Sequence, residues 1–230
     1  MDGRVKICGL CRREDVLAAD DAGADYLGVV LTGGFSRSVE PDRAAELLEG
    51  IRGQAVAVLV DEEAGEAARL ALRVGAGVVQ LHGEESPEVV AAVAAAGPWA
   101  VWKAVRVRVA DDLEGAVARY GAVADGLLLE GWREGVTGGG GARLAEALAS
   151  RAAVTIQGQA DFVLAGGLDP ANVFDAVARF RPDVVDVSSG VEAAVRRKDP
   201  DHVRRFVSEA RRAWRTRPTA VPSPRSGADP

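Results

Sequence analysis

The stretch DFVLAGGLDPANVFDAVARFRPDVVDVSSG, residues 161–190, contains the repeating unit that decides the fold. It opens with a short apolar run, continues through a segment with helical spacing, and ends with a second apolar run that begins 22 residues after the first. Both runs are continuous rather than alternating, which is typical of strands buried on both faces of a sheet. The stretch therefore predicts a strand, a helix and a second, parallel strand.

The same unit recurs along the whole chain. Apolar runs whose starts are 20 to 36 residues apart lie at 5–8, 25–31, 55–60, 77–81, 99–105, 125–130, 161–166 and 183–189. Eight such units predict a closed (β/α)8 barrel, the TIM barrel, in a single α/β domain. A doubly wound open sheet is the alternative. The residues VTIQ, 154–157, also resemble a strand, and we expect VTIQGQA, residues 154–160, to be an insertion ahead of the seventh strand.

The composition is that of a folded protein with a small partner. The 230 residues are 48% hydrophobic, and 28 basic against 34 acidic residues give a net charge of −6. That balance argues against nucleic acid or an anionic membrane surface as a partner. No apolar run approaches the roughly 20 residues that span a bilayer, and the N-terminus does not resemble a signal peptide. We therefore expect a cytoplasmic protein.

The ends of the chain and its cysteines add two expectations. The last 15 residues hold four of the ten prolines and almost no large apolar side chain, so 216–230 is predicted to be a disordered tail after a barrel domain at 1–215. The two cysteines, Cys8 and Cys11, are too few for a disulfide framework and fit a reducing compartment.

Small residues follow the seventh and eighth predicted strands. In a barrel, functional groups project from the C-terminal ends of the strands, and a phosphate site commonly follows strands 7 and 8. Exposed backbone N–H groups and helix N-termini there favour a bound anion. The sequence therefore predicts a phosphate site at Gly166, Gly167, Ser188, Ser189 and Gly190, which the glycine stretch 138–141 could complete. The alternative is a tight turn followed by a helix cap.

The motif C-G-L-C, residues 8–11, has three interpretations. A zinc site would need two more ligands, and neither His82 nor His202 has a metal-site spacing, so no metal is predicted. A redox dithiol would place a reactive cysteine at a helix N-terminus. Cys8 alone, at a strand end, is either a buried apolar residue or a thiolate that acts as nucleophile or base.

Charged residues at the other strand ends complete the candidates. Glu130 ends the apolar strand GLLLE, where burial would raise its pKa to suit proton donation; the alternative is a solvated carboxylate. Arg37, in the loop after the second strand, can bind a carboxylate or phosphate at the barrel mouth. Lys103, Arg106 and Arg108 are predicted to form a partly solvated strand exit.

These residues resemble the phosphoribosylanthranilate isomerases of tryptophan biosynthesis. The resemblance runs from Val5 to about Phe206 and rests on VKICGL, FSRSVEP, VVQLHGEESPE, WKAVRV, DGLLLE, VLAGGLDPANV and VDVSSGVE in this order. The related histidine-pathway isomerases share the phosphate loops but carry an aspartate after the first strand. Cys8 therefore favours the anthranilate branch.

The resemblance implies an Amadori rearrangement of N-(5-phosphoribosyl)anthranilate, a small phosphorylated substrate, without cofactor or metal. It implies that Cys8 is the general base and that Glu130 occupies the position of the general acid. It also implies that Arg37 faces the anthranilate carboxylate and that His82 and Asp186 line the site. It leaves the oligomeric state open.

The sequence departs from the family at three places. The family's acid is an aspartate, and Glu130 is longer by one bond, about 1.5 Å. The sixth loop has become EGWREGVTGGGGARLAEAL, and Cys11 replaces a polar residue. Two alternatives follow: a paralogue that acts on another aminosugar phosphate or anthranilate derivative, and a non-catalytic barrel that binds a phosphorylated ligand.

Overall fold

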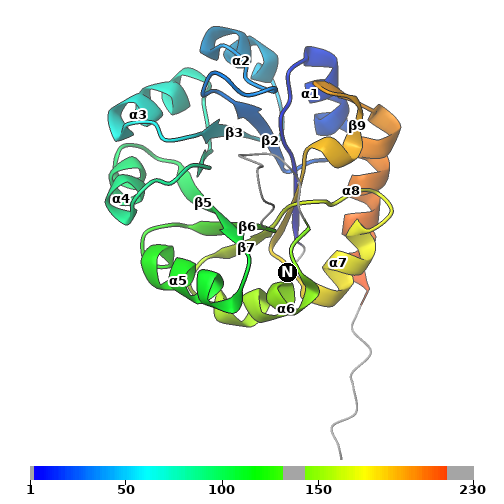
Figure 1. Ribbon diagram of the computed structural model, residues 1–230. Helices are drawn as coiled ribbons and strands as arrows, with labels where there is room; N and C mark the ends of the chain where they lie inside the picture. Colours follow the sequence, from blue (N-terminus) through cyan, green and yellow to red (C-terminus); the bar gives the residue numbers. More distant parts are fainter. Residues whose placement is uncertain (1–2, 132–142, 217–230) are drawn as a thin grey trace, which may run out of the picture.

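The computed structural model describes residues 3–131 and 143–216, which form a barrel of parallel strands enclosed by helices (Figure 1). The barrel strands are β1 (Arg4–Ile7), β2 (Tyr26–Val30), β3 (Gln54–Leu59), β4 (Val78–Leu81), β5 (Ala100–Val107), β6 (Gly126–Gly131), β7 (Asp161–Leu164) and β8 (Val184–Val187). The helices are α1 (Arg13–Asp21), α2 (Pro41–Leu48), α3 (Ala64–Arg73), α4 (Pro87–Ala95), α5 (Ala110–Tyr120), α6 (Glu146–Thr155), α7 (Val173–Phe180) and α8 (Pro200–Arg215).

Pairing between the first and last strands closes the barrel. Strand β1 pairs with β2 on one side and with β8 on the other, in a register that runs from Arg4 opposite Val184 to Ile7 opposite Val187. Each strand coincides with one of the apolar runs in the sequence, so the predicted (β/α)8 barrel is confirmed. An open sheet is excluded, because its first and last strands would not pair.

The apolar side chains form two cores. The larger lies between the strands and the surrounding helices, and the smaller fills the inside of the barrel. At the centre of the inner core the ring of Trp102 packs edge-on against Tyr26, with centroids 4.8 Å apart. Gly126, on the neighbouring strand β6, makes room for this indole, since a Cβ there would lie 2.6 Å from it. The filled interior confines a ligand site to the ends of the barrel.

Two short elements follow β8 where the sequence showed no strand or helix signal. The 3-10 turn η1 (Ser189–Val191) leads into a hairpin of β9 (Glu192–Ala194) and β10 (Arg197–Lys198). This hairpin lies beside the barrel mouth, between β8 and α8 (Figure 1).

One local prediction is wrong, and others fall outside the described residues. The segment 154–160 is not an insertion: Val154 and Thr155 end α6, and the following residues form the turn into β7. Its β-branched side chains therefore reflect the end of a helix. The glycine stretch 138–141 and the predicted tail, apart from Thr216, lie outside the described residues. Within the described part of the chain, no helix has the length and apolar character to cross a membrane.

Candidate active site

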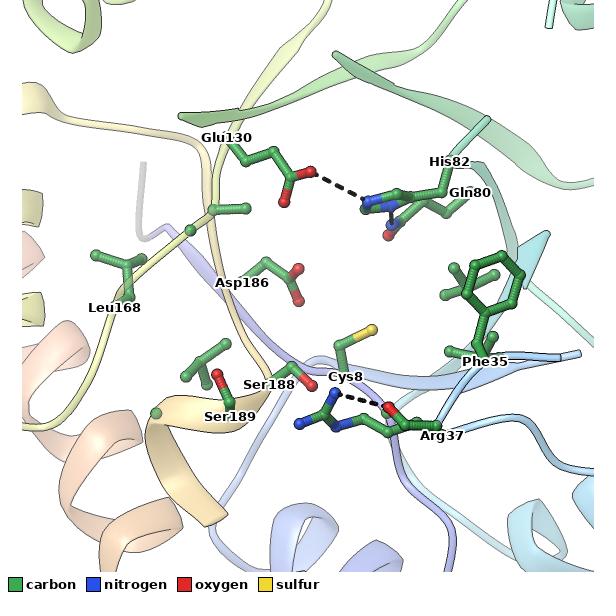
Figure 2. Close-up of a pocket in the computed structure, with 18 of the residues that line it drawn as sticks. Cys8, Phe35, Arg37, Gln80, His82, Glu130, Leu168, Asp186, Ser188 and Ser189 are labelled. Atoms are coloured by element: carbon green, nitrogen blue, oxygen red, sulfur yellow. Dashed lines mark hydrogen bonds and ion pairs between the residues drawn. The ribbon is translucent and has the colours of Figure 1, made fainter. Parts of the chain in front are cut away.

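A cavity of about 380 Å³ opens at the C-terminal ends of the barrel strands. All the residues predicted from the sequence to form the site line this one cavity (Figure 2): Cys8, Arg37, His82, Glu130, Gly166, Gly167, Asp186, Ser188, Ser189 and Gly190. An apolar wall of Phe35, Val30, Val58 and Val60 completes it on the side of β2 and β3. The closed barrel thus brings together residues that are up to 182 positions apart in the sequence.

The loops after β7 and β8 form one side of the cavity, which they line mainly with backbone atoms. Gly166 and Gly167 have φ angles of 83° and 62°, a conformation that side-chain-bearing residues rarely adopt. Gly190 touches the other loop closely, because a Cβ there would lie 1.9 Å from the carbonyl oxygen of Leu168. Within the described residues, the N–H groups of Gly167 and Ser188 donate to no protein acceptor. This side therefore offers free backbone donors of the kind that bind an anion.

Cys8 follows β1 directly and points into the cavity from the floor of the barrel (Figure 2). Two residues earlier on the same strand, the fully buried Lys6 forms an ion pair of 2.9 Å with Asp186 of β8. Burial opposes the charge of Lys6, but Asp186 and the Cys8 sulfur favour it, and its pKa is raised. Gly28 leaves room beside this group, because a Cβ there would lie 3.1 Å from Cys8 Sγ. The thiol thus sits beside a buried cation.

Glu130 projects from β6 across the cavity from Cys8, and it is only 7% exposed. Arg106, its direct neighbour in register on β5, donates through Nε to Glu130 Oε1 at 3.2 Å. His82 Nε2 lies 3.5 Å from the same oxygen. Burial raises the pKa of Glu130, but the contacts with His82 and Arg106 outweigh it, and the pKa is lowered. The predicted raised pKa is therefore wrong for the free protein, and so is the alternative of a solvated carboxylate.

His82 is oriented by a residue that precedes it on β4. The side-chain amide of Gln80, which is fully buried, lies 2.7 Å from His82 Nδ1. With the amide nitrogen facing the ring, a neutral His82 carries its proton on Nε2, the atom that faces Glu130. Among the described residues, Gln80 Oε1 is buried without a hydrogen-bond partner, and the one polar contact of His82 Nε2 is the 3.5 Å approach to Glu130.

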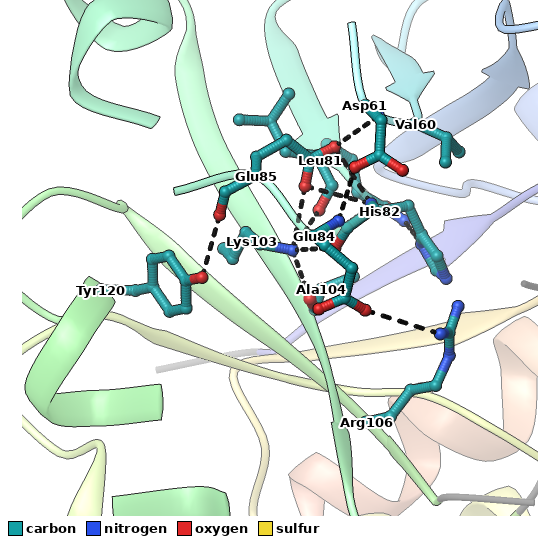
Figure 3. A network of polar contacts seen from close by, with 12 residues as sticks. Val60, Asp61, Leu81, His82, Glu84, Glu85, Lys103, Ala104, Arg106 and Tyr120 are labelled. Atoms are coloured by element: carbon teal, nitrogen blue, oxygen red, sulfur yellow. Dashed lines mark hydrogen bonds and ion pairs between the residues drawn. The ribbon is translucent and has the colours of Figure 1, made fainter. Parts of the chain in front are cut away.

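A buried polar network lies behind His82 (Figure 3). Lys103 Nζ donates to the carbonyl oxygens of Gly83 and Ala104, each at 2.7 Å, and lies 3.1 Å from Glu85 Oε2. Burial lowers the pKa of Lys103, although Glu85 opposes the shift. The prediction of a solvated strand exit is wrong for Lys103, which is 2% exposed, because its ammonium fixes the loop that carries His82.

Arg37 reaches the cavity by crossing over the glycine of the C-G-L-C motif. A Cβ on Gly9, whose φ is 69°, would lie 2.5 Å from Arg37 Cδ and 2.9 Å from Ser188 Oγ. The guanidinium of Arg37 pairs with Glu192 at 2.6 Å. The hydrogen bonds that Arg37 donates to this carboxylate are the main reason that the pKa of Arg37 is raised.

The two cysteines differ in position. Cys8 lines the cavity, whereas the Sγ of Cys11 donates to the carbonyl oxygen of Arg37 at 3.4 Å and does not line it. Both thiols are free, and burial raises the pKa of Cys11. Among the described residues, no cluster of three or more potential ligands could hold a metal ion.

Sequence reasoning missed four residues that shape the site, namely Gln80, Arg106, Glu192 and Lys198. Gln80 stands within the motif VVQLHGEESPE but was given no role, and Arg106 was expected only as part of a partly solvated strand exit. The one signal for Arg106 was its place in β5, since residues at matching positions of neighbouring strands become partners. Glu192 and Lys198 gave no signal, because they meet only through the hairpin.

Barrel and cavity together define a class: a (β/α)8 barrel whose C-terminal face gathers a thiol, a carboxyl group and an arginine around free backbone donors. The sequence model of the N-(5'-phosphoribosyl)anthranilate (PRA) isomerase family matches residues 5–209. The N-(5'-phosphoribosyl)anthranilate isomerase of Chromohalobacter salexigens is 43% identical over 213 residues, which are 90% of this chain and 93% of that protein.

Two crystal structures are similar over 90% of this chain and 98% of their own. Phosphoribosyl anthranilate isomerase from Thermotoga maritima has a TM-score of 0.81 and 34% identity. A phosphoribosyl anthranilate isomerase in complex with reduced 1-(o-carboxyphenylamino)-1-deoxyribulose 5-phosphate has a TM-score of 0.78 and 33% identity. The chain belongs to the N-(5'-phosphoribosyl)anthranilate isomerase family and is an isomerase of tryptophan biosynthesis.

Proposed function

We propose that Cys8 and Glu130 are the base and the acid of an Amadori rearrangement that converts N-(5-phosphoribosyl)anthranilate to 1-(2-carboxyphenylamino)-1-deoxyribulose 5-phosphate. The observation that carries this assignment is their placement: the Cys8 thiol and the Glu130 carboxyl group project into a single cavity from opposite sides of the barrel, whereas the other carboxyl group that lines it, Asp186, is paired with Lys6. The other residues of the cavity offer binding groups for the two ends of such a substrate.

The substrate is held by its two anionic ends. Backbone N–H groups of Gly166, Gly167, Ser188, Ser189 and Gly190 receive the phosphate, because donors fixed in the backbone bind an anion without further ordering. Arg37 receives the anthranilate carboxylate, to which a guanidinium donates charge-assisted hydrogen bonds. The furanose ring then lies between these ends, next to the groups that transfer protons.

The reaction begins with two proton transfers, one from Glu130 and one to Cys8. Glu130 donates a proton to the furanose ring oxygen, the C1–O bond breaks, and the nitrogen lone pair forms the C=N bond of an iminium ion. Cys8 as thiolate then removes the proton from C2, the C2–H electrons form the C1=C2 bond of an enolamine, and the C=N π electrons return to nitrogen as its lone pair. Protonation at C1 and loss of the enol proton give the ketone.

Glu130 must be protonated for the first step. In the free protein, His82 and Arg106 lower its pKa. A bound substrate brings a phosphate and a carboxylate into the same cavity, and like charges raise the pKa of a carboxyl group. We therefore expect substrate binding to be accompanied by proton uptake. His82 and Asp186 line the site, where Asp186 compensates the buried charge of Lys6.

A cytoplasmic location belongs to this proposal. Cys8 acts as a base only while its thiol is reduced, and a reducing compartment keeps thiols free.

Growth of a tryptophan auxotroph that lacks the isomerase tests the reaction. The chain should restore growth, whereas Cys8→Ser should not, because a hydroxyl is a far poorer base than a thiolate. Cys11→Ser is the matched control and should restore growth, since Cys11 does not line the cavity. Equal loss in both variants would contradict the assignment. Failure of the unchanged protein, if it still binds the product analogue, would instead favour another aminosugar phosphate as substrate.

A further inference from the structure

The hairpin β9–β10 approaches the active site but takes no part in the proton transfers. Its two inward side chains are Glu192 at the start of β9 and Lys198 at the end of β10, and their side chains are almost fully buried. Lys198 also anchors the hairpin to α1, because its backbone N–H donates to the carboxylate of Asp15 at 3.1 Å. The hairpin is therefore a fixed element beside the cavity.

Glu192 binds one edge of the Arg37 guanidinium. Its two carboxylate oxygens accept from Nε at 2.8 Å and from Nη2 at 2.6 Å, so the contact is bidentate. Among the described residues, the one partner of Nη1 is the hydroxyl of Ser36, at 3.5 Å. The pairing fixes the plane of the guanidinium and leaves its Nη1 edge for a ligand, because the fork geometry allows two bonds along each edge.

Lys198 in turn fixes Glu192 and connects it to the phosphate side. Its ammonium lies 3.2 Å from Glu192 Oε1 and donates to the carbonyl oxygen of Ser188 at 2.9 Å. Burial raises the pKa of Glu192, but Arg37 and Lys198 outweigh it, so the pKa is lowered and the group is held as a carboxylate. One chain of contacts therefore links the loop that carries Arg37 to the loop that carries Ser188.

The turn of the hairpin holds the loop of Arg37 from its outer side. Arg196 donates through Nη1 to the carbonyl oxygens of Ser36 and Ser38, at 2.9 and 3.1 Å. The hairpin thus contacts both the backbone on each side of Arg37 and its side chain. These contacts restrict the conformations of the Arg37 side chain before a ligand binds. Binding therefore costs less conformational entropy than it would for a free arginine.

We propose that Glu192 is a positioning residue for substrate recognition, which orients Arg37 toward the aromatic carboxylate of the substrate while Lys198 ties the same carboxylate to the phosphate loop. The inference rests on the proposed function, in which Arg37 receives that carboxylate. It adds the hairpin as the element that selects an aminosugar phosphate with an ortho-carboxyphenyl group over one with a plain phenyl group.

Calorimetric titration with two ligands tests this role. The first is reduced 1-(o-carboxyphenylamino)-1-deoxyribulose 5-phosphate, and the second is the same molecule without the carboxyl group. The unchanged protein should bind the first more tightly. Glu192→Gln keeps the size of the side chain but turns an NH2 group toward Arg37. We expect it to weaken binding of the first ligand by about tenfold, the loss of one charge-assisted hydrogen bond, and to leave the second unchanged.

Steady-state kinetics supply a second readout. Glu192→Gln should raise KM with little change in kcat, because Glu192 touches no reacting group. Glu66→Gln is the matched control: Glu66 pairs with Arg69 on the exposed surface of α3 in a similar two-bond contact, and both ligands should bind it as they bind the unchanged protein. If Glu192→Gln folds poorly, the double variant Glu192→Gln, Lys198→Met removes the second buried charge as well and should show the same loss of preference.

The outcomes separate the two proposals. If the unchanged protein does not prefer the carboxylated ligand, the role of Arg37 in the proposed function is wrong, and the role of Glu192 falls with it. If the unchanged protein shows the preference and Glu192→Gln retains it, only the role of Glu192 is overturned. Equal weakening of both ligands also overturns it, because that result indicates general support of the barrel mouth.

Discussion

The two sides of the cavity are built in different ways. The loops after β7 and β8 consist of small residues whose function lies in backbone conformation and close contact, as at Gly167 and Gly190. The ends of β4, β5 and β6 instead carry long polar side chains that orient one another, as Arg106 and His82 orient Glu130. The first side, the glycine side, depends on the space that the absence of side chains leaves. The second, the charged side, depends on ion pairs and hydrogen bonds between side chains. Substitutions should therefore affect ligand binding on the first side and proton transfer on the second.

The largest effect, a loss of kcat, is expected from a substitution of Glu130 on the charged side. Glu130→Gln keeps the shape of the side chain but cannot donate the proton that ring opening needs, so kcat should fall by about 10² to 10⁴-fold. Binding of the reduced product analogue should change little. Steady-state kinetics and titration calorimetry measure the two quantities. A variant with full turnover would show that Glu130 is not the acid.

On the glycine side, Gly190→Ala should raise KM. The added Cβ would lie 1.9 Å from the carbonyl oxygen of Leu168, so the two loops must separate by about 1 Å, enough to cost roughly 10 to 100-fold. The matched control is Gly115→Ala on α5, where no atom lies within 4 Å of the added Cβ and the helix should gain about 0.5 to 1 kcal/mol. An unchanged KM in Gly190→Ala would remove the phosphate site from these loops.

The sequence predicted the glycine side of the cavity better than the charged side. Strands and glycine loops were predictable because apolar runs and turn residues act locally, and Gly166 and Gly167 were predicted for this reason. Gln80 and Glu192 were not assigned, because their partners come from other elements or from packing that appears only after folding. The state of Glu130 was mispredicted for the same cause: burial could be inferred from GLLLE, but the neighbouring Arg106 and His82 could not.

Glu130→Asp tests whether the charged side has adapted to the longer acid. In the free protein, Arg106 and His82 meet the Glu130 carboxylate where its extra methylene places it. We therefore expect the shorter aspartate to lose both contacts and kcat to fall by roughly 10 to 100-fold, as for a displacement near 1 Å. An equal or higher kcat in steady-state kinetics would show instead that the backbone keeps the position suited to aspartate.

The smallest effect is expected from substituting Arg106, which lies 3.2 Å from Glu130 Oε1 and 4.0 Å from Glu84 Oε1. Its guanidinium is partly exposed, with 28% of the side chain accessible, so solvent screens its charge and Arg106→Met should raise the pKa of Glu130 only slightly. Because the acid form is active, kcat/KM falls as the pH rises through the pKa of Glu130. Raising that pKa moves this falling limb to higher pH, which a pH profile of kcat/KM measures directly.

The same substitution, Arg106→Met, should alter stability in acid. Catalysis requires the protonated form of Glu130, whereas the contribution to stability comes from its carboxylate form. A carboxyl group whose pKa is lowered on folding stabilises the protein above its unfolded pKa, and this contribution is lost as the pH falls through the folded value. Arg106→Met should therefore lessen the loss of melting temperature on acidification, whereas Arg106→Lys, which keeps a cation beside Glu130, should behave like the unchanged protein in both measurements. If the methionine and lysine variants shift the kinetic limb equally, the charge of Arg106 does not set the pKa of Glu130, and the charged side of the cavity acts through shape, as the glycine side does.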